Sequence, residues 1–255
     1  MTAAFIGGCA LLGLMAGSFA NVCVHRIPKG ESIVFPGSHC PACGQAIAWY
    51  DNLPLFSWLW LRGRCRDCHA GIAIRYPLLE FLMGASWGFL AWHFGPVPQL
   101  AMGLVLVSLL WVLTFIDLET VLLPDTITLP GIVVGLLFSF WTGKPADSLI
   151  GATAGYGLFW LVARIFLLLT GREGMGYGDF KLLAMLGAFF GWQALPFIIF
   201  VSAFCGAVIG GIWLLVSRRH ARAEIPFGPY LALAGMLWLL TGQDIWQWYL
   251  SLVRI

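Results

Sequence analysis

Charged side chains are scarce in this chain. Of its 255 residues only 10% are Asp, Glu, Lys or Arg, whereas 60% are hydrophobic. The surface of an ordinary soluble domain carries far more charge than this. The composition therefore excludes a soluble globular protein and predicts a chain that crosses a membrane several times.

Three further absences narrow the class of protein. No basic residue precedes the first apolar run at 3–24, although a cleavable signal peptide begins with one, so we expect this run to be a retained helix. No Gly-rich turn follows a strand, which argues against a Rossmann-type domain. The net charge is only +2 and the basic residues form no stripe, so we expect no nucleic-acid partner.

Long apolar runs are what the sequence does contain. A helix needs roughly 17–25 apolar residues to cross a bilayer, and we predict an all-α bundle of about eight transmembrane helices, two of them short. One segment between the first two helices is long enough to be a folded unit. The predicted division is helix 1 at 1–24, a cytoplasmic loop domain at 25–76 and a seven-helix bundle at 77–255. The eight apolar segments are 3–24, 77–94, 99–116, 127–141, 149–169, 180–190, 196–216 and 227–240.

Basic residues predict the orientation of this bundle. Lys and Arg concentrate in cytoplasmic loops, and with eight spans nearly all of them fall on one side. We therefore expect both termini to lie on the non-cytoplasmic side of the membrane. The predicted cytoplasmic residues are Arg26, Lys29, Arg62, Arg64, Arg66, Arg75, Arg172, Lys181, Arg218, Arg219 and Arg222, against Lys144 and Arg254 on the other side.

Glycine pairs spaced four residues apart recur in the apolar segments. This spacing lets two helix backbones approach closely in lipid, and their number predicts a tightly packed bundle. The pairs are Gly13 with Gly17, Gly84 with Gly88, Gly131 with Gly135, Gly151 with Gly155, and Gly206 with Gly210.

Two C-x-x-C motifs lie in the long loop. Cys40 and Cys43 form the first, and Cys65 and Cys68 form the second after 21 intervening residues. This spacing is typical of a single tetrahedral Zn²⁺ site, which would be structural because four thiolates leave no position for water. Two disulfides or a redox pair are the alternatives, and a cytoplasmic location argues against stable disulfides.

Two aspartates stand at the ends of apolar segments, Asp117 and Asp179. Neighbouring carboxyl groups cannot both ionise cheaply, so one keeps a proton while the other acts as a base, as in aspartic proteases. A lone aspartate there is equally typical of a helix cap, which is the interpretation favoured for Asp125. Gly176 and Gly178 permit unusual backbone angles beside Asp179 and let a substrate strand approach without a side chain in the way. Lys181 is interpreted as an interfacial anchor that also favours an ionised neighbour.

Several motifs together resemble those of one family, the type IV prepilin peptidases, and the resemblance runs nearly end to end. They are Gly17-Ser18-Phe19-Ala20-Asn21-Val22, His25-Arg26-Ile27-Pro28, both cysteine pairs, Trp49-Tyr50-Asp51-Asn52, Leu61-Arg62-Gly63-Arg64-Cys65, Arg75-Tyr76-Pro77-Leu78-Leu79-Glu80, Ile116-Asp117, Pro124-Asp125-Thr126-Ile127-Thr128-Leu129-Pro130, Gly176-Tyr177-Gly178-Asp179-Phe180-Lys181-Leu182-Leu183 and Pro226-Phe227-Gly228-Pro229.

The resemblance implies an inner-membrane aspartic protease with Asp117 and Asp179 as catalytic residues. Its substrates would be type IV prepilins and type II secretion pseudopilins, cut after the glycine that ends a short basic leader. It also implies methylation of the new N-terminus with S-adenosylmethionine. Candidate residues for that second activity are Glu80, Arg26, Asp51 and Asn52.

Two other functions remain open at the level of sequence. One is a leader peptidase without methyltransferase activity, in which the cysteine loop only docks the substrate. The other is a membrane redox or transport protein that uses cysteine pairs and intramembrane acids. Against the latter, no file of ionisable residues crosses the predicted bilayer.

Overall fold

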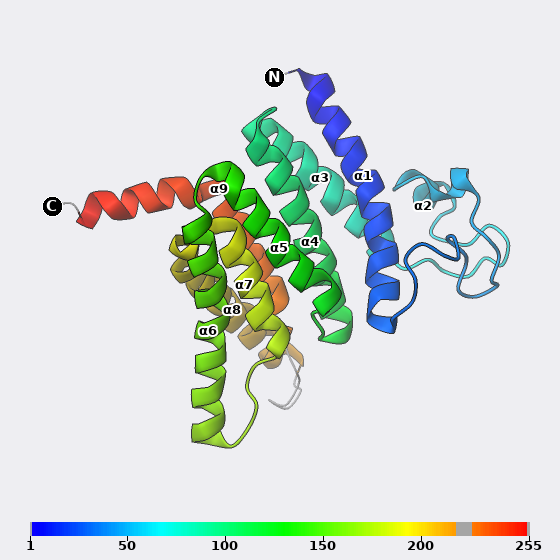
Figure 1. Cartoon of the computed structure of the whole chain (residues 1–255). Helices are drawn as coiled ribbons and strands as arrows, with labels where there is room; N and C mark the ends of the chain where they lie inside the picture. The colour runs from blue at the N-terminus through cyan, green and yellow to red at the C-terminus, as the bar shows by residue number, and fades with distance from the viewer. Residues whose placement is uncertain (1, 218–225, 254–255) are drawn as a thin grey trace. The chain divides into compact units, whose positions relative to one another are not determined.

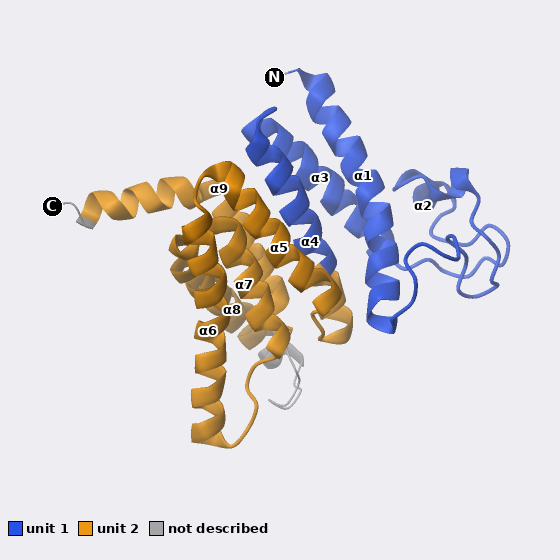
Figure 2. Ribbon diagram, viewed as in Figure 1, with its two compact units in different colours: residues 1–112 blue, residues 113–255 orange. Residues whose placement is uncertain are grey.

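The computed structural model describes residues 2–217 and 226–253. Within these ranges the chain is helical and contains no named strand, only two isolated β-bridges. It divides into two compact units, residues 1–112 and 113–255, which are coloured separately in Figure 2 and described one at a time below. The predicted all-helical class is confirmed.

A helix forms at each of the eight apolar segments (Figure 1). Every helix end but one lies within four residues of the predicted range, and the exception is α9, which continues to Val253. Short helices also occur in the long loop and before α8. The elements are α1 Ala3–Arg26, η1 Ile27–Lys29, η2 Trp49–Asn52, α2 Phe56–Trp60, α3 Arg75–Phe94, α4 Pro98–Thr120, α5 Asp125–Thr142, α6 Pro145–Thr170, α7 Tyr177–Phe190, η3 Trp192–Ala194, α8 Leu195–Ser217 and α9 Gly228–Val253.

Five of the described helical segments are long and apolar enough to cross a membrane: α1 with η1, α4, α5, α6, and η3 with the first part of α8. The other three of the eight differ for identifiable reasons. Charged residues interrupt the start of α3, polar residues interrupt the second half of α9, and α7 has only 14 residues. At 1.5 Å per residue α7 is about 21 Å long, short of a hydrocarbon core of about 30 Å. Eight complete spans therefore remain a prediction.

Unit 1 is built on the close pairing of α1 with α3. A Cβ at Gly17 would lie 2.6 Å from the Cα of Glu80, and one at Gly13 would lie 2.9 Å from the Cα of Gly84. Only glycine allows this approach, so the predicted packing role is confirmed at these positions. The indole nitrogen of Trp87 also donates to the hydroxyl of Ser108 at 3.1 Å, which joins α3 to the first part of α4.

Unit 2 is organised around α7. This helix packs against α5 and α6 and also contacts α8 and α9. Every residue from Asp179 to Phe189 except Lys181 is buried. A helix that is apolar on all sides is typical of a protein core. Packing inside unit 2 therefore accounts for α7, although it is too short to cross the bilayer. Gly151 of α6 and Gly187 of α7 meet backbone to backbone, where a Cβ on either would be within 2.4 Å of the other's carbonyl.

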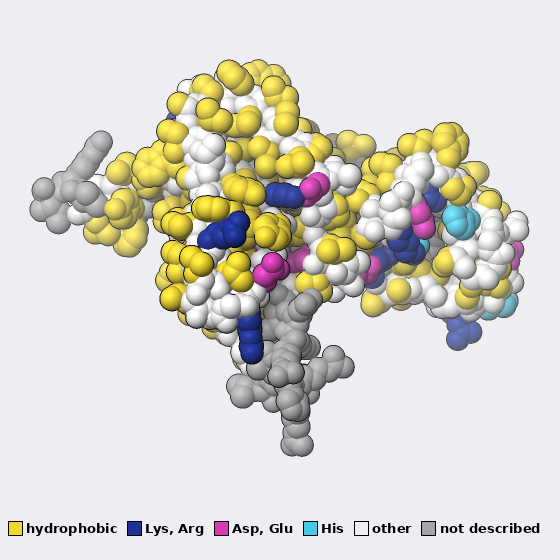
Figure 3. All heavy atoms as spheres, turned by 60° about the horizontal axis from the view of Figure 1, so that its bottom comes forward, with side chains coloured by type: hydrophobic (Ala, Val, Ile, Leu, Met, Phe, Trp, Pro, Cys, Tyr) yellow, Lys and Arg dark blue, Asp and Glu magenta, His cyan; other side chains and the backbone are white. Residues whose placement is uncertain are grey.

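Hydrophobic side chains cover most of the surface seen in Figure 3, and charged groups are few. Leu168 and Leu169 near the end of α6 are 84% and 80% exposed, and Phe200 of α8 is 70% exposed. Such side chains face lipid in a protein that crosses a bilayer. The predicted orientation stays a prediction, and Arg218, Arg219, Arg222 and Arg254, on which it partly rests, lie outside the described residues.

Candidate active site and metal centre

One end of unit 2 brings together four helix ends. The last turn of α4 carries Asp117, and the first turns of α5 and α7 carry Asp125 and Asp179. The fourth end is the start of α9 at Gly228, whose backbone N–H donates to Oδ2 of Asp117 at 2.9 Å. Three of these ends are helix N-termini, where the helix dipole favours negative charge. The end of the bundle is thus suited to hold carboxylates.

Asp117 is buried with only 4% of its surface exposed. Its carboxylate accepts a hydrogen bond from the N–H of Gly228. Burying a carboxylate costs free energy, and a charge-assisted hydrogen bond of this kind lowers that cost. The sequence motif Pro226-Phe227-Gly228-Pro229 contained this residue, but nothing local to the motif showed that Gly228 would donate to an acid 111 positions earlier.

Asp179 is also buried, at 8% exposed, and its carboxyl group lies close enough to that of Asp117 for their charges to repel. The structure therefore brings together the two aspartates that the sequence analysis paired. Two neighbouring buried carboxyl groups are more stable when one of them is protonated than when both are ionised. The protonated group can then act as an acid and the ionised group as a base.

Gly176 and Gly178 do not adopt the unusual backbone angles predicted for them, and their predicted role in letting a substrate strand approach stays a prediction. Gly176 has an extended backbone (φ −72°, ψ 142°), and neither glycine is among the described positions with positive φ, so no unusual backbone angle is involved. Gly178 is needed for space instead, because a Cβ there would lie 2.6 Å from Cβ of Leu123 in the α4–α5 connection. At Gly176 a Cβ would be an ordinary 3.6 Å from Oδ2 of Asp179.

Asp125 is not the helix cap that its position predicted. The cap position of α5 is Pro124, which makes no side-chain cap bond, and Asp125 is the first helical residue. Its Oδ1 instead pairs with Nζ of Lys181 at 2.5 Å, which ties the start of α5 to α7. Lys181 was expected to favour an ionised Asp179, but the carboxylate with which it pairs is that of Asp125.

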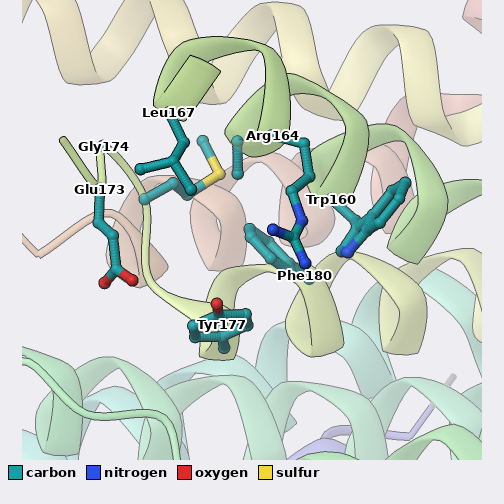
Figure 4. Close-up of a pocket in the computed structure, with 9 residues that line it drawn as sticks. Trp160, Arg164, Leu167, Glu173, Gly174, Tyr177 and Phe180 are labelled. Carbon is teal, nitrogen blue, oxygen red and sulfur yellow. The ribbon is translucent and has the colours of Figure 1, made fainter. Parts of the chain in front are cut away.

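A hollow lies on the α6 side of α7 (Figure 4). Trp160 and Arg164 of α6 line it together with Tyr177 and Phe180, which flank Asp179 in sequence. Residues three apart share a helix face, so Asp179 points elsewhere and neither catalytic candidate lines this hollow. In Figure 4 the guanidinium of Arg164 lies between the rings of Trp160 and Phe180, and its carbon is 5.5 Å from the Trp160 centroid.

The four loop cysteines converge in unit 1. The sulfur atoms of Cys40, Cys43, Cys65 and Cys68 all lie within 4.8 Å of one another, and those of Cys40 and Cys68 are 3.8 Å apart. Four sulfurs bound to one zinc ion at about 2.3 Å would be about 3.8 Å apart in a tetrahedron. None of the seven cysteines is in a disulfide. The cluster thus has the size and donor set of a metal site, and the cysteines fit Zn²⁺.

The two cysteine motifs have the same backbone conformation. In each, the N–H of the first cysteine donates to the carbonyl five residues later, and its own carbonyl accepts from the N–H four residues later. Each motif also turns through one residue of positive φ and closes with an isolated β-bridge. The matching pairs are Cys40 N to Gln45 O (2.9 Å) and Cys65 N to Ala70 O (2.8 Å), Gly44 (φ 74°) and His69 (φ 57°), and the bridges His39–Ala46 and Arg64–Gly71. Two such knuckles facing each other are typical of a zinc ribbon.

Three of the four candidates for methyl transfer make hydrogen bonds within or to the loop. Arg26 is buried and donates to the carbonyls of Ser32 (2.9 Å) and Gly37 (3.2 Å). Asp51 accepts two hydrogen bonds from Arg66, which hold the pKa of Asp51 below its usual value. Glu80 accepts from the N–H of Leu55 at 2.8 Å, and Asn52 is exposed in η2. These contacts do not gather the four residues at one point, so their assignment remains a prediction.

Two family models match the chain. "Bacterial Peptidase A24 N-terminal domain" covers residues 11–94, and "Type IV leader peptidase family" covers residues 104–211. The first match contains the four cysteines, and the second contains both aspartates. Together with the curated relatives described next, these matches show that the chain belongs to the type IV leader peptidase family and is an enzyme. Five of its described helical segments are long and apolar enough to cross a membrane.

Curated relatives match along almost the whole chain. Proteins named prepilin leader peptidase/N-methyltransferase from Aeromonas salmonicida, Pseudomonas aeruginosa and Neisseria gonorrhoeae are 44%, 43% and 40% identical to it. The alignments cover 95%, 97% and 95% of this chain and 93%, 94% and 93% of those proteins. No solved structure matches the chain.

Proposed function

We propose that this enzyme cuts the basic leader from type IV prepilins and pseudopilins at the cytoplasmic face of the bacterial inner membrane, after a glycine, with Asp117 and Asp179 as its catalytic pair. The observation that carries the proposal is the meeting of two buried carboxyl groups at one end of an apolar helical unit. The names of the relatives supply the substrate class. A basic leader stays in the cytoplasm while an apolar pilin helix enters the bilayer, so the scissile bond would fall at such an end.

In the proposed mechanism, the ionised aspartate takes a proton from a water molecule, which attacks the glycine carbonyl. The protonated partner donates to the developing oxyanion and later to the leaving amine. The N–H of Gly228 favours the ionised form of Asp117 by donating to it. We therefore assign the base to Asp117 and the acid to Asp179.

The membrane arrangement and the cofactors belong to the same proposal. Eight spans with both termini periplasmic would place the aspartates on the cytoplasmic side. One Zn²⁺ ion held by the four cysteines would keep the 25–76 loop folded and take no part in peptide cleavage. Methylation by S-adenosylmethionine is supported by the names of the relatives, and we look for its site in the cysteine loop and the start of α3.

The experiment that tests the proposed function is the intact mass of a prepilin substrate after incubation with the purified enzyme in detergent. Samples with and without S-adenosylmethionine are compared. Loss of the leader in both, with one added methyl group only when the methyl donor is present, is the expected result. Cleavage without methylation would leave a simple leader peptidase, and an unchanged mass would contradict the proposal.

Gly228→Ala is expected to lower cleavage by about 10- to 100-fold, equivalent to about 1.4–2.8 kcal/mol in the barrier. The added Cβ would lie 2.7 Å from Oδ2 of Asp117, so the carboxylate must move away from its hydrogen-bond donor. Gly176→Ala is the matched control, because its Cβ has room and its backbone suits alanine. Equal losses in the two variants would show that the Gly228 contact does not position Asp117.

Asp125→Asn is expected to leave cleavage within a few-fold of the natural rate. Its carboxylate is 56% exposed and pairs with a Lys181 side chain that is 23% exposed, and such pairs contribute roughly 0.2–1 kcal/mol to stability. Thermal unfolding of Asp125→Asn, Lys181→Met and the double variant measures that coupling. If Asp125→Asn abolished cleavage while the protein stayed folded, Asp125 would belong to the catalytic group.

A further inference from the structure

The short helix α2 in the cysteine loop exposes an unusually apolar face. Phe56 is 60% exposed, Leu59 is 66% exposed and Trp60 is 72% exposed, whereas Ser57 on the opposite face is 6% exposed. Phe56 and Trp60 stack with their ring centroids 6.0 Å apart. Large side chains displayed together in this way mark a surface that contacts something other than water.

One hydrogen bond shows the position of α2 along the axes of α1 and α3. The N–H of Leu55, the residue just before α2, donates to Oε2 of Glu80 at 2.8 Å. Glu80 lies in the second turn of α3, and it packs against Gly17 of α1. The long loop therefore folds back, so that α2 lies beside α1 rather than beyond its end, as Figure 1 shows.

A second contact fixes the register of α1 and α3. The side-chain nitrogen of Asn21 donates to the carbonyl of Tyr76 at 3.0 Å, so the start of α3 is level with Asn21. A glutamate side chain points toward the N-terminus of its helix, which places the Glu80 carboxylate between the levels of Gly17 and Asn21. Val24 is the last apolar residue of α1 before His25 and Arg26. At 1.5 Å per residue, α2 starts roughly 5–10 Å inside the apolar end of α1.

This depth identifies what covers the apolar face. Because α1 is long and apolar enough to cross the bilayer, a segment beside α1 at the level of Gly17–Asn21 meets the boundary between lipid headgroups and acyl chains. Trp and Phe are the residues favoured there, and interfacial helices bury their apolar face by about 5–10 Å. Arg62 and Arg64 follow directly and are exposed, which suits contact with anionic headgroups.

We propose that α2 is a membrane anchor, which inserts Phe56, Leu59 and Trp60 into the lipid of the cytoplasmic leaflet and so holds the cysteine loop against the bilayer. The loop is then attached at three places: the end of α1, the start of α3 and α2. The indole nitrogen of Trp58 donates to the carbonyl of Ile72 at 3.2 Å, which transmits this attachment to the segment that follows the second cysteine pair. The inference does not depend on peptide cleavage or on methylation.

Site-directed spin labelling in lipid nanodiscs tests the anchor. Cys9 and Cys205 are replaced by alanine, and Cys23 is buried. The labelling is done with Zn²⁺ present, because Cys43 and Cys68 of the loop cluster are exposed and must be protected as its ligands. Leu59→Cys and Trp60→Cys are the test positions. Leu12→Cys, on the exposed surface of α1, is the lipid reference, and Glu31→Cys, exposed in the same loop, is the water reference. Intact mass confirms a single label in each variant.

The readout is the ratio of collision rates with oxygen, which enriches in lipid, and with a water-soluble nickel chelate. At positions 59 and 60 we expect a higher ratio than at position 31, with a value approaching that at position 12. A ratio equal to that at position 31 would overturn the proposal by placing α2 in water. Low access to both reagents would overturn it by showing that α2 packs against protein.

A second measurement covers the case in which the cysteine replacements prevent folding. A benzophenone-bearing amino acid is introduced at position 60 of the otherwise natural chain, and after irradiation the intact mass is recorded. Lipid adducts at position 60, with none at position 31, support the anchor. Intramolecular crosslinks without lipid adducts contradict it.

Discussion

Asp117→Asn and Asp179→Asn are each expected to lower the rate of prepilin cleavage by about 10²- to 10⁴-fold, the contribution typical of a positioned acid or base. Asparagine keeps the shape of the side chain but can neither take a proton from water nor donate one to the oxyanion. The fold should survive, because the amide has the size of the carboxyl group it replaces and places no charge in this buried site. Single-turnover rates, read as the fraction of substrate that has lost its leader, give the measurement.

Asp147→Asn is the matched control for both variants. Asp147 is an aspartate of the same unit, in the first turn of α6, and it accepts hydrogen bonds from Trp192 (3.2 Å) and Gln193 (3.1 Å). Its loss removes a charge without touching the pair. Cleavage at the natural rate by either Asp117→Asn or Asp179→Asn would refute the dyad, and methyl transfer to an already cleaved substrate reports that the variants are folded.

Cys40→Ser is expected to remove the bound zinc and unfold the cysteine loop. Structural Zn²⁺ in small peptide sites contributes about 10–16 kcal/mol of apparent binding free energy at neutral pH, which is as large as the whole stability of a typical domain, about 5–15 kcal/mol. The loop has little else to hold it, because many of its apolar side chains are exposed, including Phe35 at 77% and Trp49 at 79%. Elemental analysis and limited proteolysis of the loop measure the two effects.

Cys205→Ala serves as the control for that substitution, since Cys205 lies in α8, away from the cluster in sequence and outside unit 1. It should retain one zinc per chain and the protease resistance of the natural protein. Chelation of the natural protein should reproduce the effect of Cys40→Ser. A Cys40→Ser protein that kept one zinc and an intact loop would show that the four cysteines are not its ligands.

The sequence was sufficient to locate the helices and the cysteine cluster because both depend on local patterns. An apolar run must satisfy its backbone by hydrogen bonds within itself, so eight such runs predict eight helices. Two C-x-x-C motifs close their own knuckles through bonds between residues four and five apart. Composition was less able to separate a span from a core helix, because α7 is as apolar as a span but only 14 residues long.

The roles of single polar residues were harder to predict for a different reason. Asp125 looked like a helix cap because its neighbours in sequence are a proline and a helix start, yet its partner Lys181 is 56 residues away. Gly178 was predicted to allow an unusual backbone angle, but in the structure its lack of a side chain leaves space for Leu123. Neither contact leaves any sign in the local sequence.

The sequence by itself determined that this chain is a helical membrane protein with a four-cysteine cluster and two acids at helix ends, since hydropathy and short-range spacing are properties of the chain alone. Only the tertiary structure decided that Asp117 receives the N–H of Gly228, and that Glu80 draws the start of α2 back beside α1. These contacts join residues 111 and 25 positions apart. Packing of helices against one another brings such residues together, and no local pattern encodes which helix ends will meet.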